Sequence, residues 1–108
     1  MNWIPVCRLK DIVPNTGVCA LVHGAQVAVF RLADEQLYAL DNRDPFSNAN
    51  VLSRGIVGDL KGERVVASPV YKHHFSLTTG QCLEEPDVKL TTWPVRLEGH
   101  TVWVGTAP

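Results

Sequence analysis

The sequence predicts an antiparallel all-β fold in a single domain. Its apolar runs are short and rich in valine, turn-forming residues separate them at close intervals, and no long segment repeats with the helical period. A chain of 108 residues with 45% hydrophobic and 19% charged residues can bury one ordinary core. We therefore expect one domain that spans residues 1–108.

The first strands form a hairpin. Residues 18–22 and 26–32 are β-prone runs on either side of His23-Gly24-Ala25, and Gly24 can adopt the positive φ that a tight hairpin turn requires. Residues 37–40 follow the turn at residues 33–35 and predict the next strand.

Later in the chain, loops give way to a further strand and a second hairpin. Residues 55–62 are polar and glycine-rich, residues 65–67 resume the sheet, and residues 95–97 and 101–104 alternate across a turn at 98–100. Prolines at positions 14, 45, 69, 86 and 94 fall in loops or at strand ends, where a missing N–H does no harm. Short helical turns fit only at residues 9–13 and after Phe46, where Ser47 or Asn48 is the expected cap.

Composition excludes several classes of partner and compartment. Ten basic and eleven acidic residues give a net charge of −1, which disfavours nucleic acid and anionic membranes as partners. The sequence has no secretory pattern at its start and no stretch that approaches a membrane span. Three cysteines without a C-x-x-C motif describe neither a disulfide framework nor a zinc site, and they indicate the reducing cytoplasm. We expect Cys19, in a strand between Val18 and Ala20, to be buried as a small apolar group.

Two loop segments, residues 42–46 and 68–72, carry the most specific information. The stretches around them resemble the strands and turns that frame the two ligand loops of a Rieske-type [2Fe–2S] domain, and the likeness covers roughly residues 3 to 105; these stretches are Tyr38–Arg43, Leu52–Gly55, Val65–Ala67 and Phe75–Leu83. The resemblance implies an antiparallel Rieske-like sandwich or barrel with a smaller β subdomain, about residues 41–83, that carries both loops.

The four positions that would bind the cluster hold unsuitable residues. A Rieske domain uses Cys-x-His in its first loop and Cys-x-x-His in its second. The matching positions here are Asp44, Phe46, Ser68 and Tyr71. Phe46 has no donor atom, and the other three offer hard oxygens where the cluster requires thiolate or imidazole. We therefore expect vestigial loops without a cluster and no metal or other cofactor in this chain.

Among cluster-free Rieske-like proteins, the chain is most similar to the small subunit of assimilatory NAD(P)H-dependent nitrite reductase. The segments that carry this resemblance are residues 16–21, 26–31, 44–46, 51–55 and 66–69. The resemblance implies an accessory subunit of a cytoplasmic complex that reduces nitrite to ammonium with NADH or NADPH. It places FAD, an iron–sulfur cluster and sirohaem on the large subunit, and it gives this chain a structural role.

The two loops together predict a surface for a partner protein. Aromatic residues and arginine are enriched where interfaces concentrate their binding energy. The predicted interface comprises Arg43, Asp44, Phe46, Val70, Tyr71 and Lys72. For Asp44 the alternative is a local role, because Asp side chains readily accept backbone N–H groups two residues further on.

No autonomous active site is expected. The pair His73-His74, with Cys82, is the only candidate metal cluster, but neighbouring side chains on a strand point to opposite faces. Ser68 lacks the surroundings of a catalytic nucleophile, and no nucleotide-binding motif is present. We expect the three tryptophans at positions 3, 93 and 103 to lie in the core or at its rim, residues 84–87 to form a solvated loop, and His23 and His100 to be exposed.

Two rival functions stay open at this point. The first is an electron carrier whose cluster uses substitute ligands such as Ser68, Tyr71, Cys82 and a histidine. The second is a cluster-free Rieske-like module that serves another oxidoreductase.

Overall fold

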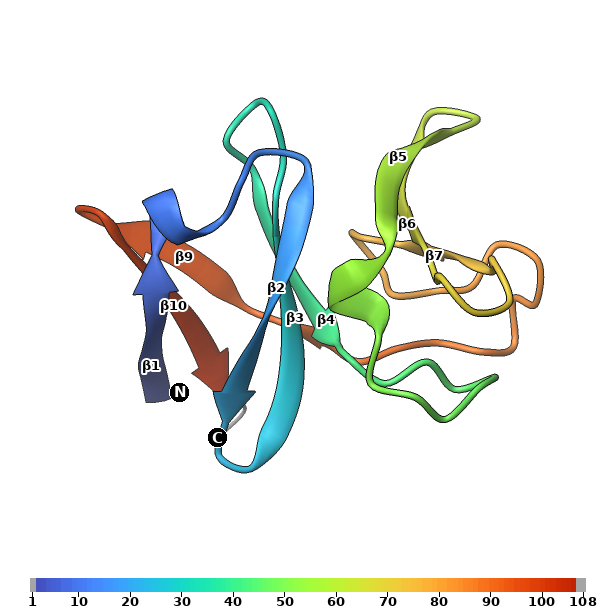
Figure 1. Ribbon diagram of the computed structural model, residues 1–108, viewed down its shortest axis with the longest axis horizontal. Coiled ribbons are helices and arrows are strands. Elements are labelled where there is room, and N and C mark those ends of the chain that lie inside the picture. Colours follow the sequence, from blue (N-terminus) through green and yellow to red (C-terminus); the bar gives the residue numbers. More distant parts are fainter. Residues whose placement is uncertain (1, 107–108) are drawn as a thin grey trace.

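Three antiparallel sheets make up the computed structural model, which describes residues 2–106 (Figure 1). The sheet orders are β1-β10-β9, β2-β3-β4-β8 and β5-β6-β7. The strands are β1 (Asn2–Arg8), β2 (Thr16–Val22), β3 (Ala25–Arg31), β4 (Leu37–Asp41), β5 (Ile56–Leu60), β6 (Glu63–Ala67), β7 (His74–Ser76), β8 (Thr92–Trp93), β9 (Val95–Glu98) and β10 (Thr101–Thr106); two 3-10 turns are η1 (Leu9–Asp11) and η2 (Leu52–Arg54). The predicted all-β, Rieske-like class is confirmed.

The β2-β3-β4-β8 sheet is the middle layer, with one of the other sheets on either side of it (Figure 1). The residues of β3 explain why this sheet lies in the middle. Val27 and Val29 belong to one core and Ala28 and Phe30 to the other, and all four are fully buried. Because successive side chains in a strand point to opposite faces, a strand covered on both sides must be apolar throughout.

The first core lies between the middle sheet and β1-β10-β9, and we call this part of the molecule the base. Strands β1 and β10 pair from Asn2↔Thr106 onward, so the first and last described residues lie side by side. The buried members of this core are Ile12, Ala20, Val22, Val27, Val29, Ala39, Val102 and Val104. The predicted hairpin at residues 95–104 is the β9–β10 pair, with Glu98 opposite Thr101.

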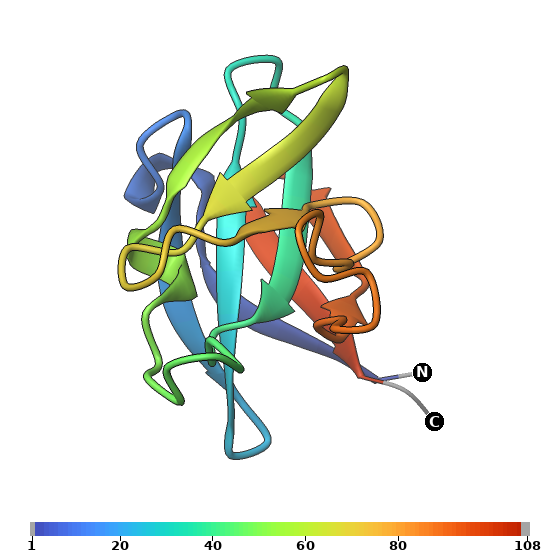
Figure 2. The ribbon, with the colours of Figure 1, turned by 90° about the vertical axis from the view of Figure 1, so that its right-hand side faces the viewer.

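The second core lies between the middle sheet and β5-β6-β7, and we call this part the loop end. Its buried members are Ala28, Phe30, Leu32, Leu40, Leu52, Val66, Phe75, Leu77, Cys82 and Leu90. The first predicted loop follows β4, and the second joins β6 to β7. Figure 2 looks onto this end of the molecule.

Several local predictions are confirmed. The β2–β3 hairpin turns at His23 (φ 49°) and Gly24 (φ 81°), and η1 falls within the predicted helical turn at residues 9–13. Both His23 and His100 are exposed, and the three tryptophans are half-buried. Among the described residues, no helix is long and apolar enough to cross a membrane.

The prediction for Cys19 is wrong, because its side chain is exposed. Strand β2 pairs with β3 alone, so it is an edge strand of the middle sheet. Its inward residues Ala20 and Val22 pack into the base, whereas Cys19 lies on the opposite face. That face is only partly covered at the edge of the sheet, and the Cys19 thiol lies 3.5 Å from the Nδ2 atom of Asn42.

The turn expected after Phe46 lies earlier than predicted, although the Ser47 hydroxyl does accept a backbone N–H, that of Ala49, at 3.3 Å. The turn begins at Asp44, whose backbone carbonyl accepts the Asn48 N–H at 2.7 Å and whose carboxylate accepts the Phe46 N–H at 2.9 Å. Asn48 has φ 61°, a left-handed conformation that ends the turn. The turn η2 at Leu52–Arg54 was not predicted; its first residue, Leu52, is fully buried in the second core.

Candidate functional site

The first loop, residues 42–50, is anchored by a buried asparagine. The Asn42 side chain accepts the Ser53 N–H at 2.7 Å and donates to the Asn50 carbonyl and the Gln26 side chain, both at 3.2 Å. The Asn42 side chain therefore connects both ends of the loop with strand β3 of the middle sheet. The sequence contained a signal for this role, since Asn42 directly follows a strand and opens a loop, but asparagine is common in solvated loops as well.

The second loop, residues 68–73, closes on itself. The Ser68 N–H donates to the His73 carbonyl at 2.9 Å, and the Lys72 N–H donates to the Ser68 carbonyl at 3.1 Å. Pro69 follows Ser68 and fixes the start of the turn, and Lys72 has φ 64°. The Ser68 hydroxyl also lies 3.4 Å from the Val70 N–H.

The two loops meet at Asp44 and Ser68, both of which are fully buried. The Ser68 hydroxyl donates to the Oδ2 atom of Asp44 at 2.5 Å, the distance expected when a hydroxyl donates to an ionised carboxylate. Burial acts to raise the pKa of Asp44, but hydrogen bonds from the Ser68 hydroxyl, the Phe46 N–H and Ser47 outweigh it, so the pKa is lowered. The carboxylate therefore stays ionised inside the protein.

A second contact between the loops is aromatic. The Phe46 ring stacks on the His73 ring with centroids 3.7 Å apart and planes inclined by 8°, and it meets the Phe75 ring at 6.2 Å. The Nδ1 atom of His73 is buried and has no hydrogen-bond partner. The sequence analysis places Phe46 and Tyr71 in one predicted interface; the ring that stacks on Phe46 in the structure is that of His73.

These residues do not fit a [2Fe–2S] cluster. Two thiolates on one tetrahedral metal, each at about 2.3 Å, lie about 3.8 Å apart. At the same positions, the oxygens of Asp44 and Ser68 are 2.5 Å apart with a proton between them, which leaves no room for a metal. Tyr71, at a third position, is 61% exposed. Within residues 2–106, no three His, Cys, Asp or Glu side chains are grouped so that they could hold a metal ion.

The predicted interface residues form a small exposed tip around the buried contacts. Arg43, Val70, Tyr71 and Lys72 are exposed, and Phe46 is half-buried. The Arg43 guanidinium donates to the Asn48 side chain at 3.0 Å, which holds it against the first loop. Asp44 is buried beneath this tip, so it supports the surface and does not itself reach a partner.

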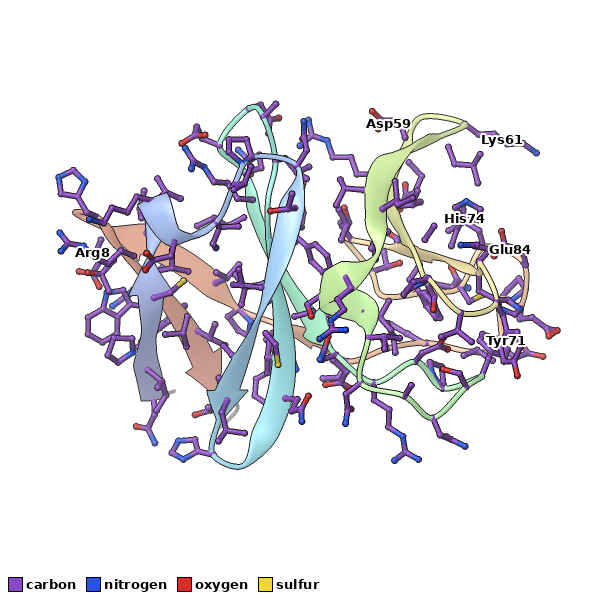
Figure 3. All side chains as sticks on the ribbon, viewed as in Figure 1. Arg8, Asp59, Lys61, Tyr71, His74 and Glu84 are labelled. Atoms are coloured by element: carbon purple, nitrogen blue, oxygen red, sulfur yellow. The ribbon has the colours of Figure 1, made fainter. Side chains whose placement is uncertain are left out.

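A third loop, residues 83–88, lies beside the second. The Nδ1 atom of His74 is 2.6 Å from the Oε2 atom of Glu84, and the Leu83 N–H donates to the His74 carbonyl at 2.8 Å. Burial acts to raise the pKa of Glu84, and its bonds with the backbone and side chain of His74 lower it more strongly. Figure 3 shows Tyr71, His74 and Glu84 at the same end of the molecule, far from Arg8. Sequence reasoning missed this neighbour, because residues 74 and 84 are brought together only by the fold.

His73 and His74 point apart, as the strand geometry predicts. His73 stacks on Phe46, and His74 pairs with Glu84. Cys82 is buried in the second core, and its thiol lies 3.7 Å from the Oε1 atom of Glu84. Burial is the main cause that raises the pKa of this thiol, so it behaves as a packed apolar group.

Comparison with known proteins agrees with this geometry. A family model described as a Rieske-like [2Fe–2S] domain matches residues 2–105. The nitrite reductase (NADH) small subunit of Salmonella typhimurium is 43% identical over 102 residues, which are 94% of each chain. The solution structure of the nitrite reductase NAD(P)H small subunit from Erwinia carotovora has a TM-score of 0.83 at 47% identity and covers 98% of this chain and 82% of that one.

One relative has a different architecture. The nitrite reductase NAD(P)H large subunit of Klebsiella oxytoca contains a segment that is 44% identical over 103 residues, which is 95% of this chain and 11% of that protein. The near-complete matches to independent small subunits and to the family model agree with the three-sheet fold. The chain belongs to the nitrite reductase small subunits, within the Rieske-like [2Fe–2S] domain family.

Proposed function

We propose that this chain is the accessory small subunit of a cytoplasmic NAD(P)H-dependent nitrite reductase and that it binds the large subunit through the loop end. The observation that carries the proposal is the Klebsiella oxytoca protein, in which a domain like this one is part of the same polypeptide as a large subunit. A domain that is separate in one organism and covalently joined to a second protein in another is well explained by a stable association between the two.

The contribution of this chain is binding energy and shape. The loops offer a buried carboxylate, a hydroxyl and a phenyl ring at the positions where a Rieske domain binds iron, so electron transfer through this chain has no carrier there. FAD, an iron–sulfur cluster and sirohaem then belong to the large subunit, which reduces nitrite to ammonium with electrons from NADH or NADPH. A subunit that binds the folded partner stabilises it by mass action.

The tip has the composition of a contact surface. Val70 is 43% exposed and Tyr71 is 61% exposed, although both lie in a turn whose conformation is set by backbone bonds and does not require apolar side chains. Lys72 follows them in the same turn, and Arg43 is exposed on the first loop. Exposed aromatic residues and arginines are typical of the residues that dominate binding energy.

Co-purification tests the proposal. The tagged chain is co-expressed with the large-subunit homologue of the same organism, and the captured partner is assayed for sirohaem, flavin and iron. Capture of a sirohaem-containing large chain is the expected result. Stoichiometric iron and a visible spectrum in the small chain alone would instead favour the electron carrier, and stable capture of a different oxidoreductase would favour the module of another enzyme.

A matched pair of variants tests the docking surface. Val70→Asp places a charge on the tip, and Leu97→Asp places the same charge on β9 at a residue that is 42% exposed. We expect Val70→Asp to weaken the complex and Leu97→Asp to leave it unchanged. Equal affinities for the two variants would exclude the loop end as the contact surface.

A further inference from the structure

We infer that the Asp44–Ser68 hydrogen bond and the Phe46–His73 stack form a metal-free clamp that fixes the shape of the tip for docking. In relatives that bind a cluster, each iron is bonded to residues of both loops, so the metal joins one loop to the other. Here the two loops are joined by direct contacts. This inference rests on the proposed function in one respect, namely that the tip contacts the large subunit.

The hydrogen bond occupies the place of one iron. Asp44 and Ser68 stand at the two cysteine positions, whose thiolates would share an iron. Within residues 2–106, the bond between their side chains is the one hydrogen bond that crosses from residues 43–50 to residues 68–73. All other bonds of these segments are internal to a loop or lead to the rest of the protein.

The same two residues also hold the exposed parts of the loops. Ser68 accepts the Lys72 N–H with its carbonyl, and its hydroxyl lies near the Val70 N–H, so it fixes the turn that carries Tyr71. Asp44 binds the Asn48 N–H with its carbonyl. A displacement of Asp44 or Ser68 therefore moves the exposed residues of the tip as well.

Within the first loop, hydrogen bonds connect Asp44 to the exposed residues in the same way. Asp44 donates its N–H to the Ala49 carbonyl at 2.8 Å, and the side chain of Asn48 accepts from Arg43 at 3.0 Å. The Phe46 ring, two residues after Asp44, lies flat against His73, which is the last residue of the second loop. The clamp therefore joins the two loops at two points, and it resists both the separation of the loops and their rotation against each other.

Burial makes the polar half of the clamp strong. A hydrogen bond to an ionised group contributes more than a neutral one, and its loss leaves a buried carboxylate with one partner fewer. Removal of the Ser68 hydroxyl removes one bond to Asp44 while the Phe46 N–H continues to bind the other oxygen. The loops then lose their direct polar connection but keep their internal bonds.

The first experiment uses the isolated chain and needs no partner. Amide hydrogen exchange of Lys72 and Asn48, whose N–H groups bond to backbone carbonyls that the substitutions retain, is compared in the wild type, in Ser68→Ala and in Ser53→Ala. Ser53 is a half-buried serine next to the site, and its hydroxyl makes no hydrogen bond within residues 2–106. We expect exchange at the tip to accelerate about ten-fold or more in Ser68→Ala and to stay unchanged in Ser53→Ala. Unchanged exchange in Ser68→Ala would overturn the clamp.

The second experiment measures affinity for the intact large subunit. We expect Ser68→Ala to weaken the complex about ten-fold, and Asp44→Asn to add little in the double variant, because both substitutions remove the same bond. Val102→Ala is the control, since it destabilises the base without touching the loops. A merely structural role would make affinity follow stability in all these variants.

The outcomes separate the two proposals. Faster exchange at the tip with unchanged affinity would show that the clamp holds the loops but does not position a docking surface. If Val70→Asp also binds normally, the docking surface itself is wrong. If Val70→Asp weakens binding and Ser68→Ala does not, docking stands and the positioning role of the clamp is overturned.

Discussion

The base and the loop end of this molecule are held together in different ways. At the base, the β1–β10 strand pair and a core of small aliphatic side chains contain no buried charged residue within residues 2–106, and Val102 and Val104 are fully covered. At the loop end, the second core is larger and aromatic, but the two loops above it are joined by a buried carboxylate, a hydroxyl and a pair of stacked rings. The hydrophobic effect has no preferred direction, whereas a hydrogen bond depends on distance and angle.

The packing that stabilises the base and the proposed docking surface therefore lie in separate parts of the chain. Substitutions in the base should change the free energy of unfolding with little effect on the tip. Substitutions in the clamp should change the tip with a smaller effect on unfolding. A link between the parts does exist, because Arg64 of β6 pairs with Asp34 in the turn after β3 at 2.5 Å, but this pair is exposed and contributes little.

The largest expected effect is in the base. Ile12 is fully buried there, so Ile12→Ala should lower the free energy of unfolding by about 2–5 kcal/mol, through lost burial and the cavity that remains. Urea unfolding measures this loss. Affinity for the large subunit, measured at a temperature where the variant is still folded, should equal that of the wild type. A parallel loss of affinity would break the separation between base and loop end.

The next effect is in the clamp. Ser68→Ala should lower the free energy of unfolding by about 1–3 kcal/mol, because it removes a hydrogen bond from the buried Asp44 carboxylate. Chemical unfolding of Ser68→Ala measures this loss, and Ser53→Ala, in which no hydrogen bond is lost, is the control. Equal stabilities of the two variants would mean that water or a neighbouring group satisfies the carboxylate.

Acid should weaken the loop end selectively. The pKa of Asp44 is lower in the folded protein than in the unfolded chain, so the unfolded chain binds more protons as the pH falls below the unfolded value, about 4. The stabilisation by Asp44 is therefore complete above that value and is lost as the pH falls through the folded pKa. Between about pH 6 and pH 3, the free energy of unfolding should fall less steeply with decreasing pH in Ser68→Ala than in the wild type. Parallel curves would show that the Ser68 bond does not lower this pKa.

A smaller effect of opposite sign is expected at His73. His73→Phe keeps a ring to stack on Phe46 and removes the buried Nδ1 atom that has no partner. The free energy of unfolding should be unchanged or should rise by up to about 1 kcal/mol. Thermal unfolding together with the affinity assay measures both halves of the expectation. A clear loss of stability would mean that the imidazole makes a polar contact, for instance with water.

The smallest effect is expected at the edge of the middle sheet. Cys19 is exposed and its thiol makes only long contacts, so Cys19→Ser should change the free energy of unfolding by less than about 0.5 kcal/mol. Unfolding under reducing conditions gives the value. A loss of 2 kcal/mol or more, the size expected for a buried thiol, would restore the original prediction that this residue belongs to the core.

Local chemistry made much of the fold predictable from the sequence. The β2–β3 turn follows from Gly24, the β9–β10 hairpin follows from alternation, and η1 lies where a short helical turn was expected. The change at the vestigial ligand positions is also local, since a phenyl ring such as that of Phe46 has no donor atom in any fold. The frame residues around the loops were specific enough to predict the Rieske-like class and the nitrite reductase family.

Other features depend on which segments the fold brings together. Cys19 was placed in the core because its neighbours in sequence are apolar, but its exposure depends on β2 being an edge strand. The sequence likewise gave no sign that Phe46 stacks on His73, or that Glu84 joins the loop end through His74.

The sequence by itself determined the strands, the turns and the loss of the metal-binding atoms, because each of these depends on the properties of a residue and its immediate neighbours. The tertiary structure alone decided that Asp44 and Ser68, 24 positions apart, would bond to each other and lie beneath an exposed tip. The physical reason is that such a contact depends on the packing of two sheets against a third, and no spacing along the chain encodes that distance.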